Sequence, residues 1–283
     1  MKTPPLWMAL LLCLMGLFTG PFQVCCLLEV PLTMFDDSVD DQYIDCSPTR
    51  EARLQKQGYL PLEEKYRQTW ENASRHWAQL GQAAGSFNPT YGTAIVAYTV
   101  GDNLYGDFNA AVREAGKSQS SYQSFTFSEF HFLLTKAVQS RGTKPSCYEV
   151  FRGITGVHFT VSKKLVRFGQ FASSSLEKKV AQEFGEDTFF LIRTCHGVQI
   201  DDLSFHPHQE EVLIPPYEVF SVANHSKSPR GVTIRLESEG RFSNFNCGVR
   251  SAAGQSLLTP VGTPFFLWGL LLTWCILGPL GSL

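Results

Sequence analysis

The stretch "CYEVFRG", Cys147 to Gly153, marks the point at which the character of the chain changes. It is short, rich in β-branched and aromatic residues, and opens a series of similar segments separated by turn residues, which is the pattern of β-strands. We expect further strands at 159–171, 188–195, 197–203, 210–214, 217–224 and 231–237. A short helix is expected among them, over "SLEKKVAQEF" at 175–184. Several strands with regular breaks favour two packed sheets.

Upstream of this stretch the apolar pattern is helical. From Pro61 to Leu80 the apolar residues recur three or four positions apart, which predicts a helix that ends at Gly81. Two more helices are expected, at 107–115 and 128–139. The run "GTAIVAYTV", 92–100, fits either a strand or a buried helix, because a short apolar run has no decisive period. Helices first and strands second predict the α+β class.

The N-terminal residues 1–26 have the pattern of a secretory signal peptide. Lys2 precedes a long uncharged apolar run, and cleavage is expected near residue 26, although a cut after Gly20 also fits. A membrane anchor is the weaker alternative, because the apolar core is short. The sequence therefore predicts export.

The C-terminal residues 252–283 have the pattern of a glycosylphosphatidylinositol signal that is removed on maturation. Small residues at 251–254 precede an uncharged spacer and an apolar tail. A tail-anchoring helix is the alternative, but the run is marginal in length and has no basic cytosolic flank. We expect one domain over 27–251, held by a lipid anchor alone at the extracellular face of the plasma membrane.

Charge and cysteine content fit an exported domain. The 283 residues carry 24 Lys and Arg against 26 Asp and Glu without a basic cluster, which excludes a nucleic-acid-binding surface. Sequons at Asn72 and Asn224 are candidate glycosylation sites. Four cysteines within 27–251 allow three pairings. We favour Cys147 with Cys195, and Cys46 with Cys247, which would tie the two ends of the domain together.

The stretch "FHPHQEEVLIPPYEVF", 205–220, carries the first candidate for chemistry. If residues 209–214 are extended, Gln209 and Glu211 share one face and Glu210 lies on the other. On spacing alone, a solvated strand edge is the favoured interpretation of the two glutamates. His206 and His208 have a spacing that occurs in metal sites, but two histidines without a third ligand indicate a polar loop, so we expect no metal.

Other candidates lie in the two segments before this loop. Arg152 is a natural bidentate partner of a phosphate, and Gly153 would let a ligand approach the backbone. Ser173, Ser174 and Ser175 follow "RFGQFA" at an expected strand end, where hydroxyl groups cap a helix or contact a ligand. Each signal is weak on its own.

In their order along the chain, "YEVFRG", "VRFGQFASSSL" and "QEEVLIPPYEVF" resemble the arginine–serine–glutamate signature of the vertebrate ecto-mono-ADP-ribosyltransferases. These are surface enzymes that use NAD and are related in fold to bacterial ADP-ribosylating toxins. The resemblance continues through "FDDSVDDQYIDC", "AYTV", "DFNAAVRE" and "FHFLLTKA". The glutamine-bearing loop is most similar to the T-cell alloantigen branch. Ala172 departs from relatives that often have threonine at this position.

The resemblance implies a helical part followed by two packed sheets around an NAD cleft. It also implies that Arg152 holds the NAD phosphates, Ser173 positions NAD by hydrogen bonds, and Glu211 is the catalytic glutamate. Phe184 matches the aromatic residue that packs against nicotinamide, and Gly153 would offer backbone groups to the carboxamide. NAD is then a substrate, and no metal is involved.

Gln209 is where the sequence departs from the arginine-specific pattern, in which the first position of Glu-x-Glu is a glutamate. An acceptor guanidinium is protonated in water, with a pKa above about 12, and glutamine offers it only hydrogen bonds. We therefore expect NAD cleavage to persist, with water favoured over protein arginine as the acceptor. The alternative is a catalytically inactive surface antigen or receptor, against which the intact Arg152, Ser173 and Glu211 argue.

Overall fold

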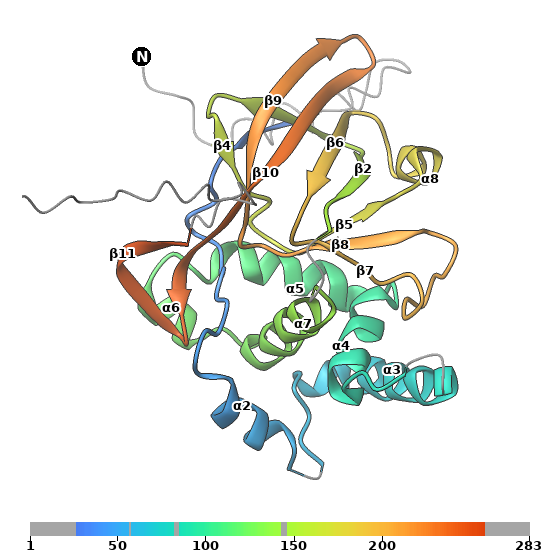
Figure 1. Ribbon diagram of the computed structural model, residues 1–283, viewed down its shortest axis with the longest axis vertical. Coiled ribbons are helices and arrows are strands. Elements are labelled where there is room, and N and C mark those ends of the chain that lie inside the picture. The colour runs from blue at the N-terminus through green and yellow to red at the C-terminus, as the bar shows by residue number, and fades with distance from the viewer. Residues whose placement is uncertain (1–26, 57, 82–84, 143–145, 258–283) are drawn as a thin grey trace, which may run out of the picture.

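The computed structural model describes residues 27–56, 58–81, 85–142 and 146–257 (Figure 1). The predicted signal peptide lies outside the described residues, and so do residues 258–283 of the predicted lipid-attachment segment. Within the described part of the chain, no helix combines the length and the apolar character needed to cross a membrane.

The first half of the domain is helical, as its periodicity predicted. After a first strand, its elements are α2 (Ser47–Leu54), a 3-10 turn (Glu64–Tyr66), α3 (Arg67–Leu80), α4 (Pro89–Thr99), α5 (Asn103–Glu114), α6 (Gln119–Gln123) and α7 (Ser128–Arg141). The second half contains most of the strands and the short helix α8 (Lys178–Glu183). The predicted α+β class is confirmed.

Two helical segments differ in detail from the sequence pattern. The helix expected from Pro61 begins at Arg67, because the segment before it turns as a 3-10 helix. Leu62 and Tyr66 are nevertheless buried, which explains the apolar period there. The ambiguous run 92–100 forms α4, buried on all sides from Tyr91 to Thr99. An enclosed helix needs no polar face, so its sequence has no helical period.

The strands are shorter or longer than expected where turns or partners intervene. The segment expected as one strand at 159–171 divides into two, and only two residues of 197–203 are extended. The strands are β1 (Leu28–Leu32), β2 (Tyr148–Ile154), β3 (Val157–Val161), β4 (Leu165–Val166), β5 (Ala172–Ser175), β6 (Thr188–Thr194), β7 (Val198–Gln199), β8 (Glu211–Ile214), β9 (Glu218–Ser228), β10 (Gly231–Asn246) and β11 (Val249–Leu257).

Over the described residues, the strands form a nine-stranded sheet and a two-stranded parallel sheet of β1 and β3. The large sheet has the order β4-β9-β10-β6-β2-β5-β8-β7, with β11 beside β10. A single pair, Phe151 with Ser175, joins β2 to β5. The strands on either side of this junction run in different directions in Figure 1, so the sheet behaves as two groups of strands.

Two apolar cores hold these groups and the helices together. One core joins the strand groups, since it contains Val212 and Ile214 of β8 together with Phe190 of β6 and Ile234 of β10. The other joins the helices to the opposite face of β8 and β7, through residues such as Leu213. Both faces of β8 are therefore covered, and Glu211 lies on the Leu213 face.

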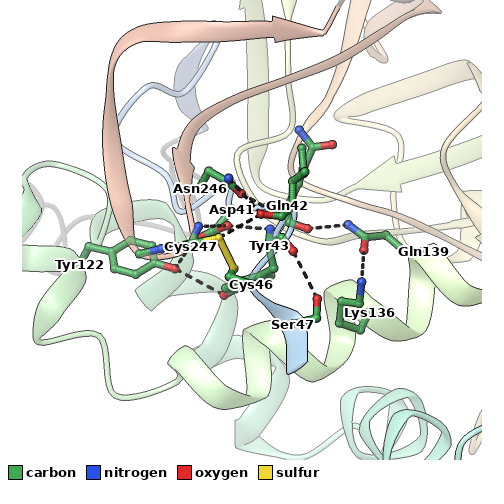
Figure 2. Close-up of a disulfide and its surroundings, with 12 residues drawn as sticks. Asp41, Gln42, Tyr43, Cys46, Ser47, Tyr122, Lys136, Gln139, Asn246 and Cys247 are labelled. Carbon is green, nitrogen blue, oxygen red and sulfur yellow. Dashed lines mark hydrogen bonds between the residues drawn. A yellow bond between two sulfur atoms is a disulfide. The ribbon is translucent and has the colours of Figure 1, made fainter. Parts of the chain in front are cut away.

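The two ends of the domain are fastened to one another (Figure 2). The disulfide Cys46–Cys247 joins the N-terminal segment to the turn after β10, and the second disulfide is Cys147–Cys195, so both favoured pairings are present. The Asp41 carboxylate accepts hydrogen bonds from the Cys247 and Gly248 amides at 3.0 and 2.7 Å. Together these contacts close the chain on itself.

A buried ion pair reinforces this closure. Arg167 and Asp40 are both fully buried and form an Nη1–Oδ2 ion pair of 2.6 Å. The same carboxylate accepts from the amides of Asn244 and Phe245. Burial raises the pKa of Asp40, while Arg167 opposes that rise. The adjacent Asp40 and Asp41 thus accept hydrogen bonds from backbone amides of β10 and of the turn that follows it.

Candidate active site

A cavity of about 480 Å³ lies where β2 and β5 meet. Its wall includes residues of β2, β5, α8 and β8, the end of α4, and the loop before β8. The six predicted substrate-site residues all line it: Arg152, Gly153, Ser173, Phe184, Gln209 and Glu211. Four separate segments of the sequence therefore converge on one space.

Glu211 begins β8 and is a buried carboxylate, with 5% of its surface exposed. Burial raises its pKa above the usual value, because a low-dielectric surrounding disfavours the charged form. The hydroxyls of Ser173 and Ser204 and the charges of His206 and Arg152 oppose this rise. Glu211 is thus an ionisable group held in a poorly solvated position beside a cavity.

Glu218 shows what a buried glutamate with a structural role looks like in the same fold. Its carboxylate accepts hydrogen bonds from Thr194 Oγ1, the amides of Cys195 and His196, and Ser238 Oγ, at 2.5 to 3.1 Å. Glu211 has only two serine hydroxyls beside its carboxylate. A carboxylate with so few internal donors keeps acceptor capacity for a ligand.

Arg152 lies on β2, and its side chain is half-buried in the cavity wall. Its Nη1 donates a hydrogen bond to the Ser173 carbonyl on β5. This contact aligns the guanidinium with the junction between the two strand groups. The remaining N–H groups of a guanidinium suit an anionic ligand such as a phosphate.

The loop before β8 reaches the cavity by a turn rather than as an extended strand. Glu210 has a left-handed backbone with φ of 47°, so the strand expected from residue 210 begins at Glu211. The Glu210 amide donates to Asp201 Oδ1 at 3.0 Å, and its carbonyl accepts from Leu176 at 3.0 Å. Gln209 and Glu211 both line the cavity, as expected. The reason is the turn at Glu210, and not the alternation of side chains along one continuous strand.

Gly153 has a packing role in addition to the one expected. A Cβ atom at this position would lie 2.1 Å from the Ala181 carbonyl and 2.3 Å from the Gly185 carbonyl. The glycine therefore lets α8 pack against β2, and on this side protein backbone occupies the space expected for a ligand. The residue still lines the cavity through its main chain.

The three serines of β5 divide their tasks. Ser174 Oγ donates to the Val212 carbonyl, and Ser175 Oγ donates to the Gln209 carbonyl, both at 2.7 Å. Ser175 Oγ also accepts from the Glu177 amide, which holds the turn into α8. Ser173, the remaining serine, is half-buried and lies at the cavity between Arg152 and Glu211.

Phe184 follows the last turn of α8 and is 55% exposed at the cavity rim. A large aromatic side chain exposed beside a cavity is available to pack against a flat ligand. His206 also lines the cavity, whereas His208 is absent from its lining. Over the described residues, no group of three or more His, Cys, Asp or Glu side chains has a metal-binding arrangement.

Sequence reasoning missed several residues around Glu211. Tyr98 is buried in α4, donates to the Phe171 carbonyl and accepts from Asn109 Nδ2. Thr99 and Ser204 are also buried near the cavity, and Ser204 contacts Glu211. The motif "AYTV" contained the first two, but a buried apolar helix gives no sign of which side chains face a site.

Comparisons with known proteins agree with this geometry. Residues 32–244 match the family model described as NAD:arginine ADP-ribosyltransferase. The chain is 41% identical over 235 residues to NAD(P)(+)–arginine ADP-ribosyltransferase 2 of Gallus gallus, covering 80% of this chain and 75% of the relative. It is 39% identical over 281 residues to the GPI-linked NAD(P)(+)–arginine ADP-ribosyltransferase 1 of Homo sapiens, covering 86% and 84%.

Solved structures are similar as well. The eukaryotic mono-ADP-ribosyltransferase ART2.2 matches with a TM-score of 0.66 and 38% identity, over 78% of this chain and 98% of that chain. A variant of the same enzyme, solved in complex with NAD, matches equally well. The similarity extends over both the helical part and the strands.

Proposed function

The chain belongs to the NAD:arginine ADP-ribosyltransferase family, and on that premise we propose that it cleaves the nicotinamide–ribose bond of NAD with water favoured over protein arginine as the acceptor. One observation carries the proposal. Arg152, Ser173 and Glu211 line the same cavity, together with a neutral Gln209. Two of the relatives above are named as arginine ADP-ribosyltransferases, and in this proposal the neutral Gln209 shifts the acceptor preference of this chain towards water.

The chemical step requires a negative charge beside the ribose. The bond between C1′ of the ribose and the nicotinamide nitrogen breaks, and the electron pair leaves with nicotinamide, which departs as a neutral molecule. Positive charge then develops on the sugar. The Glu211 carboxylate stabilises this charge, as a carboxylate does in glycoside hydrolysis. Partial burial strengthens the effect, because water screens the interaction less.

The other residues hold NAD in place for this step. Arg152 exchanges its contact with the Ser173 carbonyl for the diphosphate, and Ser173 positions NAD through its hydroxyl. Phe184 packs against nicotinamide from the cavity rim, and the Gly153 main chain contacts the carboxamide. Holding both ends of the reacting bond presents the ribose to Glu211 in a fixed orientation.

Gln209 decides what accepts the ADP-ribose. A water molecule needs only to lose a proton after attack at C1′, whereas an arginine must arrive as a protonated guanidinium and become nucleophilic. A carboxylate at residue 209 would orient the guanidinium and take up its proton, and an amide cannot. Hydrolysis therefore dominates over transfer.

The test follows the three products of NAD. Protein expressed from the full chain is incubated with NAD, and nicotinamide, free ADP-ribose and label on an arginine acceptor are measured. We expect nicotinamide and free ADP-ribose in nearly equal amounts, and a roughly hundred-fold or greater loss of both in Glu211→Ala. Nicotinamide release no higher than in that variant would support the rival function, an inactive surface antigen.

A second arm of the same experiment tests the acceptor. Gln209→Glu is expected to raise arginine labelling by roughly a hundred-fold, with nicotinamide release little changed. Glu210→Gln is the matched control, because residue 210 is absent from the cavity lining. Strong labelling by the native protein that Gln209→Glu leaves unchanged would contradict the role given to Gln209.

The proposed setting is the outer cell surface. Three relatives carry the words "GPI-linked" in their names, and the C-terminal residues of this chain have the pattern of the corresponding signal. Asn224 is exposed on β9, where a glycan could be attached. Asn72 lies on α3 and is less accessible. Release of the protein from intact cells by a phosphatidylinositol-specific phospholipase tests the anchor.

A further inference from the structure

Ser204 is a buried hydroxyl, 3% exposed, in the turn that follows β7. Its Oγ donates a hydrogen bond of 3.3 Å to Oε2 of Glu211. The backbone of this turn is fastened to Glu211 as well, because the Ile200 amide donates to the Glu211 carbonyl at 2.9 Å. The hydroxyl therefore meets the carboxylate from a turn that is itself fixed to the same residue.

The same hydroxyl also holds the loop on the acceptor side of the cavity. Ser204 Oγ accepts from the His206 amide at 3.1 Å. Between these residues, the Phe205 amide donates to Thr99 Oγ1 at the end of α4, at 2.9 Å. The Ser204 hydroxyl thus links the loop that carries His206 and Gln209 to the Glu211 carboxylate.

From this arrangement we propose that Ser204 is a positioning residue for the reaction, which fixes the orientation of the Glu211 carboxylate and couples it to the loop 205–210. The inference rests on the proposed function for its consequence in catalysis. It goes further because it assigns a task to a residue outside the arginine–serine–glutamate signature. Its chemical basis is that a hydrogen bond to a carboxylate is worth more than one to a neutral acceptor.

The surroundings of Glu211 make the contribution of Ser204 measurable. The titratable and charged groups that influence Glu211 are Arg152 from β2, His206 from the loop and Tyr98 from α4. Ser173 adds a second hydroxyl from β5. Removal of the Ser204 hydroxyl leaves Arg152, Tyr98 and Ser173 in place and frees the His206 amide, so a change in the titration of Glu211 reports the loss of the bond together with its coupling to the loop.

The experiment compares Ser204→Ala with Ser204→Thr and with Ser243→Ala in the full chain. Ser243 is a matched control, since it is also buried, at 4% exposed. Its Oγ donates to the Asp40 carbonyl and accepts from Gln42, far along the chain from the cavity residues. The measurements are kcat and KM for nicotinamide release and the carboxyl NMR titration of Glu211 in the protein without NAD.

We expect kcat to fall by roughly ten-fold or more in Ser204→Ala, with KM for NAD little changed. The Glu211 titration should move to higher pH, because the lost bond favoured the ionised form. Ser204→Thr should restore both, and Ser243→Ala should change neither. An unshifted titration in Ser204→Ala overturns the inference, and so does an equal shift in Ser243→Ala. The titration is measured without turnover. If the native protein does not cleave NAD, the proposed function is contradicted, but the titration still tests whether Ser204 positions Glu211.

Discussion

At the scale of single residues, Glu211 combines burial with a shortage of internal hydrogen-bond donors. The folded protein holds this carboxylate in an environment that raises its pKa. Because the proton is bound more tightly in the folded state, ionisation of Glu211 reduces the free energy of unfolding as the pH rises above the value at which an unfolded glutamate titrates. The buried carboxylate of Glu211 therefore lowers the free energy of unfolding at neutral pH.

This predicts that Glu211→Gln stabilises the protein while abolishing NAD cleavage. The amide removes the buried charge and can still bond to the serine hydroxyls, so a gain of about 1 kcal/mol is expected at pH 7. That gain corresponds to a rise in Tm of about 2–4 °C. The gain should shrink as the pH falls below the ordinary glutamate pKa, because Glu211 is then protonated in both the folded and the unfolded protein. Thermal unfolding between pH 4 and 8 measures it, and a gain independent of pH contradicts the explanation.

The sequence predicted residues that line the cavity, but it did not predict the contacts that hold them. Arg152, Ser173, Glu211 and Gln209 were predicted because their chemistry and their order along the chain form a motif. Ser204 was missed because only its hydrogen bond to Glu211 in the folded structure connects it to the site. The turn at Glu210 was missed because a left-handed glutamate is rare and is stabilised by Asp201 and Leu176.

At the scale of elements, the close approach of α8 to β2 shapes one wall of the cavity. Gly153 permits this approach, because the Ala181 and Gly185 carbonyls lie where a Cβ atom would be. Phe184 lies between these two residues and reaches the cavity rim for the same reason. The position of α8 thus decides both the local packing and the width of the cavity.

Gly153→Ala is accordingly expected to destabilise the domain by about 2–3 kcal/mol and to raise KM for NAD, since α8 must move away from β2. Gly106→Ala on α5 is the matched control. It lies within a helix with open space around its Cα, so alanine there should be neutral or stabilising by up to about 1 kcal/mol. Chemical denaturation of both variants measures the difference. Equal stability of the two variants would show that α8 can move away from β2 without a loss in the free energy of unfolding.

The elements that sequence reasoning missed share a physical cause. β1 is extended because it pairs with β3, more than a hundred residues away, and nothing in its own five residues requires that. α2 has no buried residue, and α6 is only five residues long. Local periodicity needs a long element with one covered face, which α3 and α5 supply and these segments do not.

At the scale of the whole molecule, the closure of the N-terminal segment onto β10 unites the helical and stranded halves. It uses a disulfide, the buried Asp40–Arg167 pair and the Asp41 contacts with Cys247 and Gly248. The closing bond spans 201 residues, against 48 for Cys147–Cys195. The first therefore restricts the unfolded chain more than the second, by about 1 kcal/mol in the chain-entropy model.

Removing each disulfide by paired alanine substitution should reveal this difference. In the chain-entropy model the losses are roughly 5 kcal/mol for Cys46–Cys247 and roughly 4 kcal/mol for Cys147–Cys195. Urea denaturation of the two double variants provides the comparison. A larger loss in the free energy of unfolding for Cys147–Cys195 would contradict this model. It would mean that packing around these cysteines in the folded protein contributes more than the restriction of the unfolded chain.

The long disulfide Cys46–Cys247 can form only late in synthesis of the chain, after its second cysteine has been made. At about 5–20 residues per second, the 201 residues between its cysteines take about 10–40 seconds to synthesise. During that interval Cys147 and Cys195 emerge while the Cys46 thiol still lacks its native partner. Either cysteine can form a non-native disulfide with Cys46, and an isomerase must then break that bond. The proposed export should therefore depend on oxidative folding catalysts.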